Sequence, residues 1–252
     1  MADMIKRAIT LGLDTLCFTE HMDMDYPVSA DTPKDMFTLN APAYREKFSE
    51  LSRAFKGKIT LRWGVEMGLQ PHIADEISDY VSSYPFDFVI GSSHLTHGQD
   101  LYYPEFYAGR PEEEAYREYF ESILENLEVC NSFDVYGHID YAVRYGPNQN
   151  KYYTYEKYAD VLEAILKKLL DMGKGIEINT KGLQVGLKEP NPSLAILKRY
   201  RELGGEVITC GSDAHSPEYI AYEFERATEI LKSCGFKYYC VFKERVPEFR
   251  NL

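Results

Sequence analysis

Six short apolar runs along the chain each stop at a residue whose side chain can bind a metal ion. Near-continuous apolar stretches are typical of strands buried on both faces of a parallel sheet. Parallel α/β barrels build their active sites at the carboxyl ends of the strands, so the residues that end these runs should converge on one mouth. The runs are TLCFTEH, ITLRWGVE, FDFVIGSSH, FDVYGH, GIEIN and EVITCGSDAH, ending at His21, Glu66, His94, His138, Asn179 and the pair Asp213 and His215. The pattern predicts a polynuclear metal site.

Helical and strand patterns alternate along the chain, and this order predicts an α/β fold with a parallel sheet and right-handed crossovers. Apolar residues at helical spacing predict helices at 2–12, 42–56, 72–83, 111–130, 154–172, 192–204 and 217–233. Strands are expected near 15–19, 59–66, 86–93, 133–138, 175–179 and 206–211. The long loops 22–40 and 95–110 follow ligand-bearing strands, so we expect them to build the substrate pocket.

Length and composition limit the classes of protein. A chain of 252 residues with 44% hydrophobic content suits one α/β barrel or two small domains. We find no internal repeat or Gly/Ser-rich linker, and this favours a single domain that spans residues 1–252. With no run of 18 apolar residues and no signal-peptide pattern at the N-terminus, a cytoplasmic protein is expected.

The charge and the cysteines exclude further classes. Forty acidic residues against 28 basic ones give a net charge of -12, which opposes binding to nucleic acid or to anionic membranes. An anionic small substrate would then need metals or a well-placed arginine. The five cysteines are odd in number and never form Cys-x-x-Cys, so we expect reduced thiols rather than disulfides or a thiolate zinc site. Cys17 and Cys210 are expected to be small core residues.

Each candidate ligand has a structural alternative. Glu66 could form a buried ion pair with Arg62, and Asp213 could cap the helix that begins near Pro217. A lone histidine is more often a satisfied core residue, but recurrence at equivalent strand ends favours ligation. His72 and His97 lie at a helix start and in a loop, so we expect both to be exposed, although His97 could touch substrate.

The motifs together resemble the polymerase-and-histidinol-phosphatase (PHP) superfamily and, within it, the histidinol-phosphate phosphatases. The resemblance rests on CFTEHMD, WGVEMG, IGSSHL, YGHIDYAVRYG, EINTKGL and CGSDAH, and it extends over nearly the whole chain. It implies a distorted seven-stranded (β/α) TIM-like barrel with up to three divalent ions of zinc, iron or manganese.

The resemblance also implies a division of the ligands. Glu66, His94 and His138 would form one complete site, Glu66 and Asp213 would belong to a neighbouring site, and His21 and His215 to a third. The family opens with a strand carrying His-x-His, whereas this chain opens with the helix expected at 2–12. We therefore expect the first strand to be missing and fewer metals to bind. An N-terminal truncation is favoured over a natural variant, because the helix keeps an apolar face without its partner strand.

The implied reaction is hydrolysis of L-histidinol phosphate in histidine biosynthesis. Metals would activate a water for attack on phosphorus, and Asp213 would orient or deprotonate it. Arg144 is the candidate phosphate clamp, with a surface ion pair as the equal alternative. Lys181 is a weaker candidate for substrate binding, since an exposed lysine explains it as well.

Substrate recognition and the alternatives remain open at this point. Asp100, Tyr102, Tyr103 and Glu105 in the long loops could meet the substrate's amine and imidazole by charge and stacking. The competing functions are a metal-binding protein with impaired or no catalysis, a phosphoesterase for another small phosphate ester, and a PHP module of the DNA-polymerase type.

Overall fold

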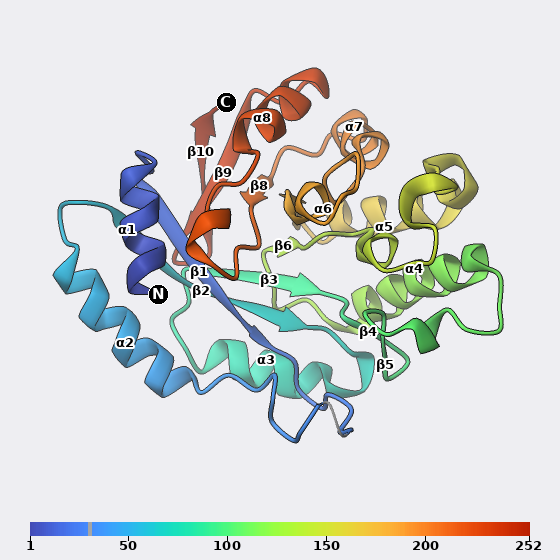
Figure 1. Cartoon of the computed structure of the whole chain (residues 1–252), viewed down its shortest axis with the longest axis horizontal. Coiled ribbons are helices and arrows are strands. Elements are labelled where there is room, and N and C mark those ends of the chain that lie inside the picture. The colour runs from blue at the N-terminus through green and yellow to red at the C-terminus, as the bar shows by residue number, and fades with distance from the viewer. Residues whose placement is uncertain (30–31) are drawn as a thin grey trace.

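A curled sheet of six parallel strands forms the centre of the computed structural model, which describes residues 1–29 and 32–252 (Figure 1). The strand order is β1-β2-β3-β6-β7-β8, and every neighbouring pair is parallel. The six strands are β1 (Thr15–Met22), β2 (Thr60–Gly68), β3 (Phe88–Ser92), β6 (Val135–Tyr136), β7 (Gly175–Asn179) and β8 (Ile208–Gly211). All six predicted strands are therefore confirmed, and they form a half-barrel whose two edges are β1 and β8. A further strand ahead of the first helix stays a prediction.

Helices connect the strands and surround the sheet in Figure 1, as the alternating pattern predicted. They are α1 (Ala2–Thr10), α2 (Ala41–Ala54), α3 (Ala74–Ser82), α4 (Glu112–Val129), α5 (Ala159–Asp171), the short α6 (Lys181–Gln184), α7 (Leu194–Glu202) and α8 (Phe224–Ser233). Single 3₁₀ turns lie at Pro71–Ile73, Pro104–Phe106, Tyr141–Arg144, Gln149–Lys151, Tyr155–Tyr158 and Pro217–Tyr219. Within the described part of the chain, none of the helices has the length and apolar character that crossing a membrane requires.

Two local predictions need correction. The continuous helix at 217–233 is wrong, because Ala221 and Glu223 adopt left-handed backbone angles and separate the turn at Pro217–Tyr219 from α8. The amide of Ala221 donates to Ser212 Oγ at 3.2 Å, which ties this interruption to the end of β8. The loop 95–110 contains a small hairpin, β4 (Leu95–Thr96) with β5 (Gln99–Asp100). The other loop, 22–40, includes residues 30–31, which lie outside the described residues.

A C-terminal hairpin was not predicted from the sequence. Strands β9 (Tyr238–Lys243) and β10 (Val246–Asn251) pair antiparallel. Cys240 and Phe242 of β9 pack against Phe88, Ile90 and Val135, with the rings of Phe88 and Phe242 stacked at 4.9 Å. The hairpin thus covers apolar side chains of β3 and β6 that would otherwise meet solvent.

Helix α2 is fixed to the sheet by a buried tyrosine. The hydroxyl of Tyr44 donates to the carbonyls of Phe18 at 3.0 Å and Gly64 at 3.1 Å, on β1 and β2. Beside it, Trp63 packs with its ring centroid 4.3 Å from that of Phe86. This packing holds β1 against β2, so that the ends of these strands, which carry the candidate ligands His21 and Glu66, stay side by side.

Gly64 provides the space for this close packing, and we expect Gly64→Ala to destabilise the fold. An added Cβ would lie 2.8 Å from the Phe88 carbonyl oxygen and 2.9 Å from Thr19 Cγ2, so backbone would have to move. We expect a loss of about 1–3 kcal/mol in the free energy of unfolding, measured by urea denaturation. Thr60→Ala, at an exposed position of the same strand, should stay within about 0.5 kcal/mol of the parent. Equal stability of the two variants would refute this account of Gly64.

Candidate metal centre

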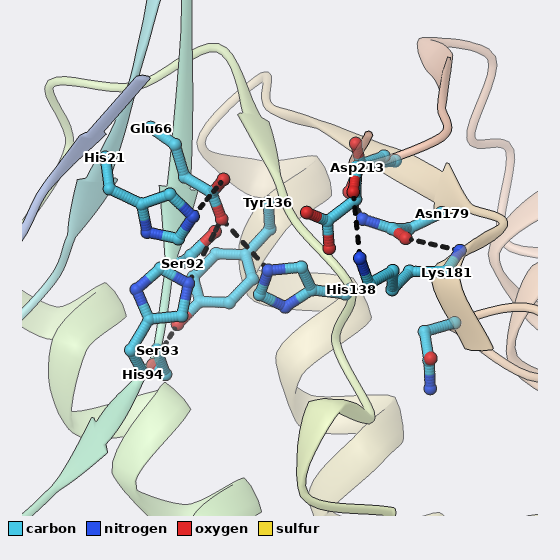
Figure 2. A network of polar contacts seen from close by, with 12 residues as sticks. His21, Glu66, Ser92, Ser93, His94, Tyr136, His138, Asn179, Lys181 and Asp213 are labelled. Carbon is cyan, nitrogen blue, oxygen red and sulfur yellow. Dashed lines mark hydrogen bonds and ion pairs between the residues drawn. The ribbon is translucent and has the colours of Figure 1, made fainter. Parts of the chain in front are cut away.

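Three imidazoles surround the carboxylate of Glu66 at the carboxyl ends of the first strands (Figure 2). Glu66 Oε1 lies 3.1 Å from His94 Nε2 and 3.0 Å from His138 Nε2. Glu66 Oε2 lies 3.6 Å from His21 Nε2. All three rings therefore present Nε2 to one carboxylate, and the predicted convergence of these four residues is confirmed.

The strand register explains how residues distant in sequence meet here. His21 of β1 is the direct neighbour of Glu66 on β2. The next strand, β3, ends at Ser92, and His94 follows two residues later. His138 likewise follows β6 by two residues. Because the carboxyl ends of parallel strands share one edge, four separate runs deliver their last side chains to the same place.

Burial and charge shift the titration of this cluster. Burial alone would raise the pKa of Glu66, but His21, His138 and His94 hold it well below its usual range. Burial would lower the pKa of His94, yet Asp23 and Glu66 raise it well above the ordinary histidine value. His138 is the exception, because burial outweighs Glu66 and lowers its pKa. A negative carboxylate thus lies among three imidazoles, of which His94 and His138 are buried and His21 is partly exposed.

The donor set fits a divalent cation. One ligand atom each from His21, Glu66 and His94 lie within 4.8 Å of one another. Imidazole nitrogens with a carboxylate oxygen suit zinc, and equally iron or manganese. In addition, His138 Nδ1 has no hydrogen-bond partner among the described residues, so the hydrogen bonding of this ring there rests on Nε2 and Glu66. The structure places His21 beside the predicted set of Glu66, His94 and His138.

Asp213 and His215 lie beyond this cluster, at the end of β8. The His215 side chain is 66% exposed, and its ring centroid lies 6.1 Å from that of His21. Asp213 has left-handed backbone angles and directs its carboxylate to Arg144 rather than to Glu66. The assignment of these two residues to further metal sites stays a prediction.

Arg144 is buried, and the surface ion pair considered from the sequence is therefore wrong. Its side chain is 2% exposed. The guanidinium donates to Asp213 Oδ2 at 3.0 Å, to Asn191 Oδ1 at 2.8 Å and to Asn179 Oδ1 at 2.9 Å. Asn179, which ended the fifth apolar run, thus accepts a hydrogen bond from Arg144 and does not contact Glu66.

A cavity of about 730 Å³ lies beside the cluster, between the two edge strands β1 and β8. Its lining includes His21, Glu66, Glu177, Asn179, Asp213 and His215. Lys181 lies next to this group, with Nζ 3.3 Å from the backbone oxygen of Asp213. The predicted ligands from β1, β2 and β8 therefore face one space large enough for a small substrate.

Two buried carboxyl groups of the site were missed by the sequence reasoning. Glu177 lies in the middle of β7, where burial, together with the charge of Glu66, raises its pKa to about 8. Asp23 contacts both His21 and His94. The available signals were a glutamate inside the apolar run GIEIN and the His-x-Asp spacing in CFTEHMD.

The remaining histidines are exposed, as predicted. His72 is paired with Asp25, and His97 lies between Glu118 and Glu125. All five cysteines are free thiols, but Cys17 and Cys210 are partly buried residues that line the cavity, and not the fully buried core residues that we predicted. Glu66 is not paired with Arg62, because its partners are the three imidazoles and the hydroxyl of Ser92, which donates to Glu66 Oε1 at 2.7 Å.

Tyrosines lead outward from the cluster toward the loop 95–110. The Tyr141 ring lies 4.7 Å from that of His138, and Tyr145 lies 5.1 Å farther along. Tyr102 follows at 5.4 Å and is exposed. Asp100 accepts hydrogen bonds from Tyr26 and from the Tyr102 amide, while Glu105 is exposed. Whether Asp100, Tyr102, Tyr103 and Glu105 touch substrate stays a prediction.

Comparison with known proteins agrees with this arrangement. Residues 1–181 match the model of the PHP domain family. A histidinol-phosphatase of Lactococcus lactis is 35% identical over 233 residues, covering 92% of this chain and 84% of that protein. A probable histidinol-phosphatase of Clostridium acetobutylicum is 34% identical, covering 88% and 83%. The crystal structure of the L. lactis histidinol phosphate phosphatase with zinc, L-histidinol and phosphate superimposes with a TM-score of 0.84 at 31% identity, covering 98% and 91%.

Proposed function

Because this chain belongs to the PHP domain family, we propose that it is a metal-dependent phosphomonoesterase that hydrolyses L-histidinol phosphate to L-histidinol and phosphate. The observation that carries the proposal is the convergence of three imidazoles on Glu66 beside a cavity of about 730 Å³. The similarity to histidinol-phosphatases over most of the chain supports the substrate. The reaction would belong to histidine biosynthesis.

The proposed metal ligands are His21, Glu66, His94, His138, Asp213 and His215. The four residues at the Glu66 cluster would hold the first ion, and Asp213 and His215 would contribute to any neighbouring ions, up to three in the family. Divalent cations bound here would activate water and neutralise phosphoryl oxygens. Zinc is the ion in the L. lactis structure.

In this proposal Asp213 would orient or deprotonate the attacking water. Burial alone would raise its pKa, but Arg144 more than offsets this and lowers it, so the carboxylate is ionised and can accept a hydrogen bond or a proton. Arg144 Nη1 also fixes the direction of that carboxylate. Because Arg144 already serves three acceptors, a phosphate group would have to share its remaining N–H groups or displace one of these partners. Lys181 is the second proposed phosphate contact.

The tyrosine series from Tyr141 to Tyr102 would receive the imidazole end of the substrate. Aromatic faces stack on an imidazole, and nearby carboxylates attract the cationic amine. Asp100 and Glu105 are the carboxylates in this loop. Such a subsite would favour histidinol phosphate over phosphate esters that lack a ring.

A phosphate-release assay tests the proposal directly. Purified protein is loaded with Zn²⁺, Mn²⁺ or Fe²⁺ and given L-histidinol phosphate, with glycerol phosphate as a matched ester that has no imidazole. We expect phosphate release that is strongest with histidinol phosphate and lost after chelation. Protein that holds metal yet releases no phosphate would refute the enzymatic function and support a metal-binding protein instead. Faster release from the other ester would refute the substrate.

A further inference from the structure

Asp23 contacts two of the histidines at the metal centre through one buried carboxylate. It lies one residue beyond β1, and only 4% of it is exposed. Its Oδ1 lies 2.7 Å from His94 Nδ1, and its Oδ2 lies 3.3 Å from His21 Nδ1. Each carboxylate oxygen therefore accepts from a different ring.

These contacts act on the ring atoms opposite to those that face Glu66. A neutral imidazole that donates from Nδ1 keeps its lone pair on Nε2, which is the atom that can bind a metal. In both rings Nε2 is the atom directed at Glu66, at 3.1 Å for His94 and 3.6 Å for His21. Asp23 thus selects the ligating tautomer of two rings and fixes their orientation together.

The backbone around Asp23 is built to hold this carboxylate. The Asp23 amide donates to the Phe37 carbonyl at 3.0 Å, and Gln70 Nε2 donates to the Met24 carbonyl at 2.9 Å. At the end of β2, Gly68 leaves the space that the side chain occupies, because a Cβ there would lie 2.0 Å from Asp23 Oδ1. The carboxylate is therefore held between the loop after β1 and the end of β2.

His138 provides an internal contrast. Its Nε2 also faces Glu66, at 3.0 Å, but its Nδ1 has no partner among the described residues. Two of the three imidazoles therefore contact a second carboxylate, while the third hydrogen-bonds only to Glu66 among the described residues and packs against the Tyr141 ring.

We propose that Asp23 is a positioning residue of the metal centre, which orients His21 and His94 jointly and so sets the affinity of the Glu66 cluster for a divalent cation. The inference rests on the proposed metal site, and it goes beyond it by assigning a role to a residue that does not itself bind the ion. Loss of such an outer carboxylate typically weakens metal binding by about 10- to 100-fold.

The test is the affinity for Zn²⁺, measured by competition with a chromophoric chelator on the full chain, with no reference to activity. We expect Asp23→Ala to weaken binding by about 10- to 100-fold. Asp23→Asn should recover part of the loss, because its amide oxygen can still accept from one Nδ1–H. Gly68→Ala should weaken binding as well, since its methyl group displaces the carboxylate without removing it. The matched control is Asp25→Asn, an exposed aspartate paired with the exposed His72, which should change the affinity less than twofold.

A second readout follows the rings themselves. In ¹⁵N-histidine-labelled, Zn²⁺-loaded protein, Nδ1 of His21 and His94 should be protonated, and in Asp23→Ala these signals should shift or broaden while that of His138 stays in place. Should Asp23→Ala fail to fold, Asp23→Asn and Gly68→Ala still test the role.

The outcomes separate this inference from the proposed function. Zn²⁺ binding as tight in Asp23→Ala and Gly68→Ala as in the parent would overturn the role of Asp23 alone. Equal, complete losses in Asp23→Asn and Asp23→Ala would indicate direct coordination and would also overturn positioning. A parent protein that binds no Zn²⁺ would overturn the metal centre itself, and this role with it.

Discussion

Replacing Glu66 by glutamine is expected to remove the bound metal from the cluster and to lower kcat/KM for L-histidinol phosphate by at least about 1,000-fold, or roughly 4 kcal/mol. Glutamine keeps the size of the side chain but has no charge. Its amide nitrogen would also turn a donor toward one of the three Nε2 atoms that now face the carboxylate. Mass spectrometry of the dialysed protein measures the loss of metal. Steady-state kinetics with the metal resupplied measure the loss in kcat/KM.

Glu76 provides the matched control for this substitution. It lies on α3, is exposed and does not line the cavity, so Glu76→Gln removes one carboxylate from the described surface without touching the cluster. Its metal content and kcat/KM should stay within about twofold of the parent, as for other surface changes. If Glu66→Gln retained both metal and activity, Glu66 could not be the central ligand.

Replacing Arg144 by methionine is expected to destabilise the folded protein by about 3–5 kcal/mol. Methionine fills similar volume but leaves the Asp213 carboxylate, which is only 15% exposed, without its cation, and leaves Asn179 and Asn191 each without the arginine donor. Removing one member of a buried ion pair costs more than the pair itself contributes, because the remaining charge stays desolvated. Chemical denaturation of the metal-free protein measures this loss without involving catalysis.

Two further variants make the Arg144 prediction specific. Arg144→Met combined with Asp213→Asn should be more stable than Arg144→Met alone, because no unpaired charge is then buried. Arg199→Met, which breaks a partly exposed pair with Glu163, should cost no more than about 1 kcal/mol. A loss of under about 1 kcal/mol for Arg144→Met would mean that Asp213 does not depend on this pair.

Features that depend on a single apolar run could be predicted well from the sequence. The six strands and the ligand type at the end of each run follow from local pattern, because a strand buried on both faces must be apolar along its length and a polar residue can appear only where it ends. The resemblance to the PHP family had the same local basis. Glu177 is the exception, since a carboxyl in mid-strand looks like a violation of the pattern until its neighbours are known.

Partnerships between distant residues could not be predicted. Asp23 and His94 are 71 residues apart, and Arg144 and Asp213 are 69 apart. Arg144 seemed as suited to the surface as to the site, because exposure depends on what packs around a side chain and not on the side chain itself. The break in the helix predicted at 217–233 had a similar origin, in the contact between Ala221 and Ser212.

The sequence by itself indicated the candidate metal ligands, four histidines, a glutamate and an aspartate at the ends of parallel strands, since hydrophobic periodicity specifies strands and strand ends share an edge. Only the tertiary structure decided how those groups are used. It gathered the three rings around Glu66, placed Asp23 behind two of them, and turned Asp213 toward Arg144. Orientation, burial and pairing are properties of neighbours in space, and the chain acquires those neighbours only when it folds.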